Sequence, residues 1–382
     1  MAPRILDVPL ETLRRERTSI KWRRYDADVL PLWIAEMDAR PCPAVVEAVT
    51  AAMTRGDTGY AGDEGYAAAL AELAEAEWGW APDPGTMVRV TDVLTGIAHL
   101  TRLLTEPGGP VVISPPVYNA FYDVIASIER QVVEAPLTAE GRLDLDLLDT
   151  TFAGVTAGGQ RAAYLLCNPH NPTGTVHSAD ELAALAEVGA RHGVRVLSDE
   201  IHAPLVYASS RFTPYLTVPG SERGITVTSA SKAWNLAGLK AALVVPGGEA
   251  RTDVARLHPF VTFGASHFGV IAQTAAYRDG RTWVHQLVDE LDANRRLLAE
   301  LVREQLPGAR LLLPESTYLA WLDLRPLGLG DHPGATLLRR GRVAVSDGTT
   351  FGSVGAGHVR VNVATSPDIL REAVARIASS FD

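Results

Sequence analysis

Three apolar runs of the sequence each end in polar side chains that a buried strand does not need. The runs and the polar residues that follow them are 161–167 with Asn171, 194–198 with Asp199, and 224–229 with Lys232. In open α/β sheets, the carboxyl ends of the strands are where ligands bind. The sequence therefore predicts one site that combines an amide, a carboxylate and an amine.

The lysine and the acid of this set indicate a particular chemistry. Lys232 lies among small residues, and a lysine that loses contact with water has a lowered pKa and can form a Schiff base. Asp199 could pair with a protonated ring nitrogen. Pyridoxal phosphate (PLP) requires both groups, so we predict this cofactor. Taken singly, Lys232 could instead be a solvated lysine, and Asp199 a helix cap or turn residue.

The phosphate of such a cofactor would need binding elements of its own. Thr95, Gly96 and Ile97 open a predicted helix, where free backbone N–H groups and the helix dipole favour an anion. Ser229 and Lys240 could add a hydroxyl group and a positive charge. These five residues form the predicted phosphate site.

The regular elements around these residues alternate between strands and helices. Further strands are predicted over 110–114 and 241–245, and helices over 66–78, 96–105 and 179–192. This βαβ rhythm predicts a mostly parallel sheet that helices cover on both faces. From about Thr282 the pattern changes to a long helix, two strands over 318–324 and 358–363, and a last helix over 368–379, which together indicate a second, α+β unit.

Composition narrows the class of protein and its partners. The 382 residues are 47% hydrophobic and 21% charged, as in ordinary globular proteins of more than one domain. With 35 basic and 45 acidic residues, the net charge of −10 disfavours binding to nucleic acid or to anionic membranes, which leaves a small molecule as the expected partner. Two isolated cysteines and the lack of an apolar leader or spanning segment predict a cytoplasmic protein.

Several motifs occur in a fixed order along nearly the whole chain. They are Thr95-Gly96, Tyr118, the run NPHNPTG over 168–174, the run SDEIH over 198–202, the run SASK over 229–232, and Arg360. This set resembles the fold-type I PLP-dependent enzymes of the class I/II aminotransferase superfamily. The runs LWIAEMD over 32–38 and KAWNLAGLK over 232–240, with SDEIH, are similar to the MalY/PatB-type cystathionine β-lyase, or C–S lyase, branch.

The resemblance implies a two-domain architecture. The large PLP-binding domain would span 44–285 and contain a mostly parallel seven-stranded sheet. The small α+β domain would combine the N-terminal arm, 1–43, with 286–382. The resemblance also implies a homodimer with shared active sites.

The resemblance also implies roles for individual residues. The implied cofactor-binding residues are Thr95, Gly96, Ile97, Tyr118, Asn171, Asp199, His202, Ser229, Lys232, Lys240 and Tyr60. Lys232 would bind the cofactor covalently and carry the proton of the substrate Cα, with Asp199 on the pyridine nitrogen. Tyr60 would reach the cofactor phosphate of the neighbouring subunit, and it is the second expected catalytic residue. Arg360 would bind the substrate carboxylate.

The expected reaction is α,β-elimination on cystathionine or a related cysteine S-conjugate, which yields pyruvate, ammonia and a thiol. His202 stands where many aminotransferases carry tyrosine, which favours the lyase branch. Ala39 stands where that branch usually carries phenylalanine, so the identity of the substrate stays open.

The alternative functions are an aminotransferase that uses the same residues, and a regulatory or binding protein on this scaffold. His170 and His202 lack the spacing of a metal motif, so no metal is expected.

Overall fold

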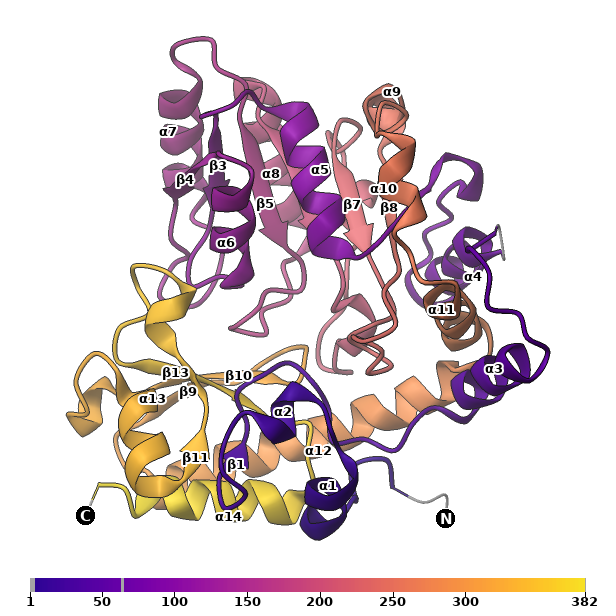
Figure 1. The fold of residues 1–382 in the computed structure, drawn as a ribbon. Helices are drawn as coiled ribbons and strands as arrows, with labels where there is room; N and C mark the ends of the chain where they lie inside the picture. The colour runs from indigo at the N-terminus through magenta and orange to yellow at the C-terminus, as the bar shows by residue number, and fades with distance from the viewer. Residues whose placement is uncertain (1–3, 63–64, 382) are drawn as a thin grey trace.

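The computed structural model describes residues 4–62 and 65–381. These residues form a seven-stranded sheet and a four-stranded sheet, each with helices packed on it (Figure 1). The larger sheet is formed by the middle of the chain. The first described residues and the last helix of the chain lie on the same side of the molecule, beside the smaller sheet.

The larger sheet is the doubly covered α/β sheet that the sequence predicts. Its strands are β2 (Val88–Val90), β3 (Pro110–Ile113), β4 (Gln131–Glu134), β5 (Ala163–Cys167), β6 (Arg195–Asp199), β7 (Ile225–Thr228) and β8 (Ala242–Pro246). Their spatial order is β2-β8-β7-β6-β5-β3-β4. Strand β8 runs antiparallel to both of its neighbours, and the other described pairs of neighbours are parallel.

Helices cover both faces of this sheet because its strands carry apolar side chains on both sides. Val111 and Ile113 of β3 belong to one buried cluster and Val112 to another, as the two-residue period of a strand requires. The first cluster includes side chains of α5 (Val93–Leu104) and α6 (Ala120–Ser127), and the second includes those of α7 (Leu145–Thr156) and α8 (Ala179–His192). The sheet is therefore the middle of three layers.

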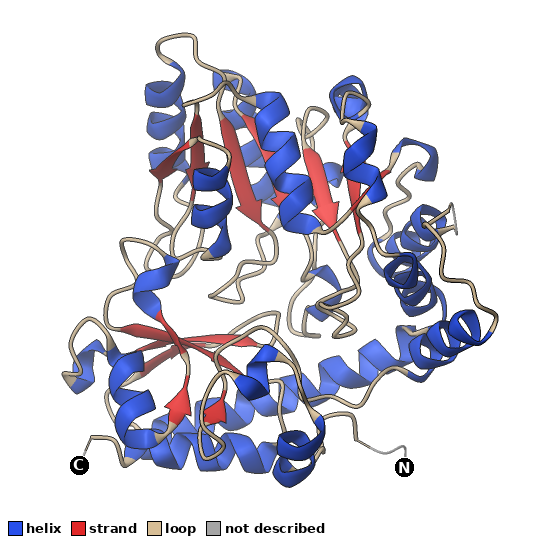
Figure 2. Cartoon of the chain, viewed as in Figure 1, coloured by secondary structure: helices blue, strands red, loops and turns tan. Residues whose placement is uncertain are grey.

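The smaller sheet is antiparallel. Its strands are β9 (Arg310–Leu312), β10 (Leu319–Asp323), β12 (Ser346–Asp347) and β13 (His358–Asn362), in the order β12-β13-β10-β9. Helices α12 (Arg281–Gln305) and α14 (Pro367–Ala378) pack on one another and run beneath this sheet in Figure 2. A separate parallel pair, β1 (Leu30–Pro31) with β11 (Val343–Ala344), ties the N-terminal part to this unit.

Shorter helices complete the fold at its edges. They are α1 (Leu10–Glu16), α2 (Ile20–Arg23), α3 (Pro43–Thr54), α4 (Tyr66–Trp78), α9 (Arg251–Val254), α10 (Pro259–Phe263), α11 (His267–Asp279) and α13 (Pro333–Thr336). Helix α11 packs on both α3 and α4 at the side of the large sheet. It is followed after one residue by the long helix α12, which leads to the smaller sheet.

Most of the predicted elements are confirmed, because their ends carry strong local signals. The helices over 66–78 and 179–192 occur as α4 and α8, and the predicted strands of the large sheet occur with bounds shifted by at most two residues. Helix α8 begins with a capping box between Ser178 and Glu181 and ends at Gly193 in the left-handed conformation. The predicted fold class, a fold-type I architecture, is confirmed.

The helix predicted to open at residue 96 begins one turn earlier, at Val93. Asp92 caps it, since its side chain accepts a hydrogen bond from the Thr95 N–H at 2.8 Å. The sequence pattern did not predict the edge strands β2 and β4. Both are short and largely half-buried, so they lack the continuous apolar run of a central strand.

The predicted domain division remains a prediction. The seven-stranded sheet lies within 44–285, and the four-stranded sheet lies within 286–382. The proposed boundary at 285/286 falls inside α12, which continues without a break from one unit to the other. The sequence pattern alone does not reveal that one helix belongs to both units.

Residues 33–37 connect the N-terminal part to both sheets. The backbone carbonyl of every residue in this segment accepts a hydrogen bond from a side chain elsewhere in the chain. In order from residue 33 to residue 37, the donors are Arg360 together with Ser346, Asn362, Lys232 together with Tyr318, Lys21 together with Asn362, and Asn235. The segment is therefore held by the smaller sheet and by the lysine of the predicted site at once.

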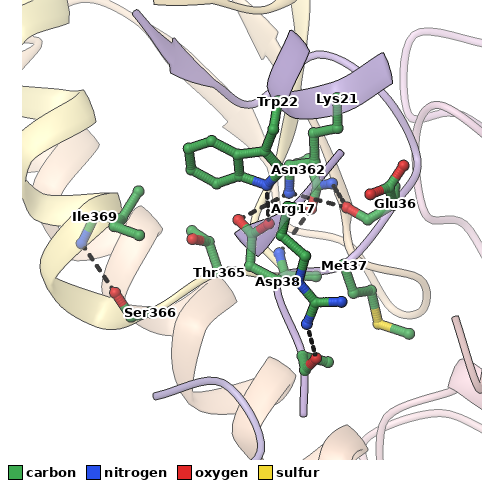
Figure 3. A network of polar contacts seen from close by, with 12 residues as sticks. Arg17, Lys21, Trp22, Glu36, Met37, Asp38, Asn362, Thr365, Ser366 and Ile369 are labelled. Atoms are coloured by element: carbon green, nitrogen blue, oxygen red, sulfur yellow. Dashed lines mark hydrogen bonds and ion pairs between the residues drawn. The ribbon is translucent and has the colours of Figure 1, made fainter. Parts of the chain in front are cut away.

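A buried ion pair holds this segment at its C-terminal end (Figure 3). The Lys21 Nζ atom lies 2.8 Å from the Asp38 carboxylate, and both side chains are almost completely buried. Lys21 also donates to the Glu36 carbonyl at 3.0 Å, and the Trp22 indole N–H donates to Asp38 at 2.9 Å. Helix α2 and segment 33–37 are thus linked by charge-assisted hydrogen bonds out of contact with water.

We expect Lys21→Met to destabilise the protein by about 3–5 kcal/mol, because it leaves the Asp38 carboxylate buried without a counter-charge. Urea unfolding measures this loss. The double variant Lys21→Met/Asp38→Asn should recover part of it, since asparagine still accepts from Trp22 and carries no charge. The exposed Arg23→Met serves as control and should lie within about 0.5 kcal/mol of the wild type. A Lys21→Met variant as stable as that control would contradict the role of the pair.

Candidate active site

The carboxyl ends of β5, β6 and β7 meet at one edge of the large sheet and form the floor of a cavity. The register places Cys167 of β5 beside Asp199 of β6, and Asp199 beside Val227 of β7. The loops that follow these strands bring Asn171, Asp199 and Lys232 to the same cavity, which holds about 710 Å³ of atom-free space, part of it open to solvent. The structure therefore brings the amide, the carboxylate and the amine together at one cavity.

Asp199 supplies the carboxylate at the bottom of this cavity. Its side chain is buried, and one oxygen accepts a hydrogen bond from the Ile201 N–H at 3.1 Å. Burial raises the pKa of the Asp199 carboxyl to about 7. An ionised carboxylate is costly in such a place unless a cation pairs with it, so the site favours a ligand with a protonated nitrogen.

Lys232 supplies the amine. The Nζ atom lies 3.1 Å from the Ala35 carbonyl, to which it donates. Burial, and next the positive charge of Arg360, lower the pKa of the Lys232 amine to about 8. A substantial fraction of the amine is therefore neutral and nucleophilic near neutral pH. The following turn is held by Asn235, which adopts a left-handed conformation and binds both the N–H and the carbonyl of Met37.

Three further predicted residues line the same cavity: Tyr118, Asn171 and His202. The Tyr118 ring meets Phe121 edge to face at 5.6 Å, and burial raises the pKa of its hydroxyl to about 12. His170 binds the Pro116 carbonyl at 2.8 Å and so holds the loop that carries Tyr118. Burial lowers the pKa of His202 to about 3, so this ring is neutral in the cavity.

Arg360 lies next to the cavity on β13 of the smaller sheet. Its guanidinium donates to the Asn171 side-chain oxygen at 3.1 Å and to the Trp33 carbonyl at 3.0 Å. Burial lowers the pKa of Arg360 to about 10, which leaves it charged at neutral pH. The buried Nε atom has no hydrogen-bond partner among the described residues, so the group retains a donor for an anion.

A second group of possible donors lies where α5 begins. The first N–H groups of a helix have no intrahelical partner, and Val93 and Leu94 of this first turn line the cavity. Ser231 and Lys240 lie beside them, and the Lys240 amine binds the Asp92 carboxylate at 2.9 Å. These groups form an anion site built from a helix N-terminus, a hydroxyl and an ammonium group.

Four predicted phosphate-binding residues are not in the cavity lining, and the structure corrects their assignment. Gly96 and Ile97 are buried against the sheet, and the Gly96 N–H is already bound to the Asp92 carbonyl. Thr95 lies in the first turn, with its N–H bound to the Asp92 side chain. These three residues are the third to fifth of the helix, because Asp92 caps it and it begins at Val93.

Ser229 is the fourth predicted phosphate-binding residue that lies outside the cavity lining. Ser231, two positions later, lines the cavity in its place. The Ser229 hydroxyl is buried beneath the cavity, 2.8 Å from the Ala241 carbonyl and 2.9 Å from the Gln273 side-chain oxygen. Gln273 also accepts from the Ala230 N–H and donates to the Ala241 carbonyl, so Ser229 belongs to a network that supports the Lys232 loop. No local pattern in the sequence distinguishes the two serines.

Tyr60 does not approach this chain's own cavity. Its side chain is 92% exposed, which is unusual for a tyrosine. The predicted role of this residue in a neighbouring subunit therefore stays a prediction.

No group of three or more His, Cys, Asp or Glu side chains in 4–62 and 65–381 is placed to hold a metal ion. Within the same residues, no helix has both the length and the apolar character needed to cross a bilayer.

Comparison with known proteins agrees with this geometry. Residues 27–377 match the family described as Aminotransferase class I and II. A Mycobacterium tuberculosis protein, provisionally named a cystathionine beta-lyase, is 49% identical over 98% of this chain and 97% of its own length. The cystathionine beta-lyase of Corynebacterium glutamicum is 35% identical over 97% of this chain and 98% of its own.

A solved structure is similar along the whole chain. It is a Corynebacterium diphtheriae protein, provisionally titled a PLP-dependent beta-cystathionase, with a TM-score of 0.92, 34% identity and coverage of 99% of both chains. The match therefore extends over both sheets, α12 and the cavity between them. The chain belongs to the aminotransferase class I and II family, in the branch that contains relatives named cystathionine beta-lyase.

Proposed function

We propose that this protein is a PLP-dependent carbon–sulfur β-lyase that converts cystathionine or a related cysteine S-conjugate to pyruvate, ammonia and a thiol. The observation that carries the proposal is the placement of Lys232 and Asp199 in one cavity, with an anion site at one end and the buried Arg360 beside it. The names of relatives that are 35% and 49% identical over nearly the full chain support the lyase over the aminotransferase.

The residues of the cavity fit PLP. Lys232 would hold the aldehyde carbon, and Asp199 the protonated pyridine nitrogen, which stabilises the buried carboxylate as an ion. Asn171 would bind the ring hydroxyl and Tyr118 would cover a ring face. The phosphate would lie on the N–H groups of Val93 and Leu94, with Ser231 and Lys240 as further donors. When bound, PLP supplies an electron sink for negative charge that develops at the substrate Cα.

The residues of the chain account for the remaining requirements of the reaction. Arg360 would bind the substrate carboxylate and thereby orient the Cα–H bond. The Lys232 amine, when it is not bound to the cofactor, would be a neutral base that accepts the Cα proton. Loss of the β-thiolate and addition of one water then give pyruvate, ammonia and, from cystathionine, homocysteine.

The decisive experiment is turnover of L-cystathionine by the PLP-loaded protein without any keto-acid acceptor. We expect many equivalents of pyruvate and of free thiol per active site, and a fall of at least 10³-fold in Lys232→Ala, which lacks the amine that moves the proton. Arg303→Ala, at an exposed position near the end of α12 and outside the cavity lining, is the control and should retain full activity. A single conversion of the cofactor to its pyridoxamine form without thiol release would indicate an aminotransferase and overturn the proposal.

The lowered pKa of Lys232 predicts how the apoprotein captures PLP. Only the neutral amine attacks the aldehyde, so the rate constant should rise with pH up to about 8 and level off above it. Stopped-flow absorbance between pH 6.5 and 10 measures this profile. Removing the positive charge in Arg360→Met should move the midpoint to higher pH, because Arg360 contributes to the lowering. A wild-type midpoint above pH 10 would contradict the proposed environment of Lys232.

We further propose that the protein works as a homodimer in which the partner subunit's Tyr60 completes each site. Exposed aromatic side chains support such an interface: Tyr60 is 92% exposed, and Phe260 and Phe263 of α10 are 79% and 67% exposed. The loop after Tyr60 and helix α10 lie together, since Ala61, Gly62 and Thr262 line one hollow. An apolar surface of this kind is typical of a protein interface.

Mixing two inactive variants tests the shared site. Lys232→Ala and Tyr60→Ala homodimers should each be nearly inactive. After subunit exchange, one of the two sites in a mixed dimer contains neither substitution, so activity should recover to about a quarter of wild type. As the control, Tyr60→Ala is taken through the same exchange without the second variant, and its activity should not recover. No recovery in a sample that shows mixed dimers by native mass spectrometry would exclude a contribution of Tyr60 from the partner.

A further inference from the structure

A second hollow lies beside Trp33 and Ser346, two residues that contact Arg360. Its lining includes Arg24, Tyr25, Trp33, Asn119 and Ser346. These side chains come from the N-terminal part, from the loop that carries Tyr118, and from β12 of the smaller sheet. The proposed reaction at Lys232 does not use any of them.

The hollow adjoins the expected position of the substrate carboxylate. Arg360 donates to the Trp33 carbonyl at 3.0 Å and to the Ser346 hydroxyl at 3.1 Å, so two residues of the outer lining touch the carboxylate-binding group directly. Asn119 follows Tyr118, which lines the inner cavity. A substrate held at Arg360 would therefore lie next to residues that also line this hollow.

Arg24 is the cation of this hollow. Its guanidinium carbon lies 5.3 Å from the centre of the Trp33 ring and 5.9 Å from that of Tyr25, and these two rings meet edge to face. Stacking on an aromatic ring holds a guanidinium in place and leaves its in-plane N–H groups free for other partners.

None of three nearby carboxylates forms an ion pair with Arg24. Asp347, which also lines the hollow, instead accepts hydrogen bonds from Gly334 and Thr349. Asp26 and Asp28, which follow Arg24 in sequence, both bind Arg342, at 2.8 Å and 2.7 Å. Within residues 4–62 and 65–381, Arg24 makes no ion pair under 4.0 Å. The arginine is thus positioned by Trp33 and Tyr25, and its charge is left for a mobile anion.

The backbone that carries Arg24 is also held in place by buried contacts. Arg24 directly follows helix α2, and Lys21 and Trp22 of that helix bind the buried Asp38. The same aspartate ends the segment whose Trp33 carbonyl contacts Arg360. Trp33 therefore contacts both arginines, Arg24 through its ring and Arg360 through its carbonyl.

We infer that Arg24 binds the distal carboxylate of a thioether that carries an amino-acid group on both sides of sulfur. This inference rests on the proposed lyase function and names its substrate class. Cystathionine has such a second carboxylate, and a simple S-alkyl cysteine does not. Arg24 is then a specificity-determining residue: it favours dicarboxylate thioethers and takes no part in proton transfer or C–S cleavage.

The first test compares two uncleavable ligands of the PLP-loaded protein. 2,7-Diaminosuberate replaces the sulfur of cystathionine by a methylene group, and norleucine has the same carbon chain without the distal amino-acid group. Titration by the cofactor's absorbance should show diaminosuberate binding at least tenfold more tightly than norleucine in the wild type and in Arg23→Gln, and less than threefold in Arg24→Gln. Equal binding in the wild type, or an unchanged preference in Arg24→Gln, overturns the inference.

The second test uses turnover, and it separates this inference from the proposed function. Arg24→Gln should lower kcat/KM for cystathionine at least tenfold, mainly through KM, and change that for S-propylcysteine less than twofold. An equal loss on both substrates contradicts a specificity role. If the wild type releases no thiol from either substrate, the lyase proposal fails, and the ligand preference in the first test still decides the role of Arg24.

Discussion

The buried Lys21–Asp38 pair is the interaction on which the arrangement of the site depends. It fixes helix α2 against Asp38 and holds the end of segment 33–37, whose carbonyls accept side-chain hydrogen bonds from both units of the molecule. These hydrogen bonds are made to backbone carbonyls, so they do not depend on the side chains of residues 33–37. The spacing of these carbonyls sets how far apart the Lys232 amine and the Arg360 guanidinium can lie, and therefore how a bound amino acid is oriented between them.

Burial raises the pKa of the acid in the cavity and lowers the pKa of the bases, so it favours the neutral form of each group. It raises the pKa of Asp199, lowers those of Lys232 and His202, and leaves Arg360 charged. In the free protein, the carboxylate and the amine are both less stable as ions than they would be in water. A ligand with a protonated ring nitrogen and an aldehyde relieves both at once, so the cavity is electrostatically incomplete without such a partner.

The sequence predicts the central part of this structure well and its edges poorly. Strands such as β5 and β6 are continuous apolar runs that end in polar residues, so their positions and the residues Asn171, Asp199 and Lys232 could be recognised. The helix start at Val93 depends on the capping hydrogen bond of Asp92, and missing it displaced the phosphate assignment to Gly96 and Ile97. Neither the backbone carbonyl of Ala35 nor the Gln273 network has a local signal, because these contacts join residues nearly two hundred and about forty positions apart.

The pairing of β1 with β11 sets the order in which the molecule can be completed during synthesis. Residues 30–38 leave the ribosome long before their backbone partners, which lie at 342–344 and 362–364. The large sheet can form while these N-terminal residues are still unpaired. The Lys232 amine acquires its carbonyl partner when the last strand of the smaller sheet has been made, so a truncated or stalled chain would expose the apolar N-terminal segment and lack a finished site.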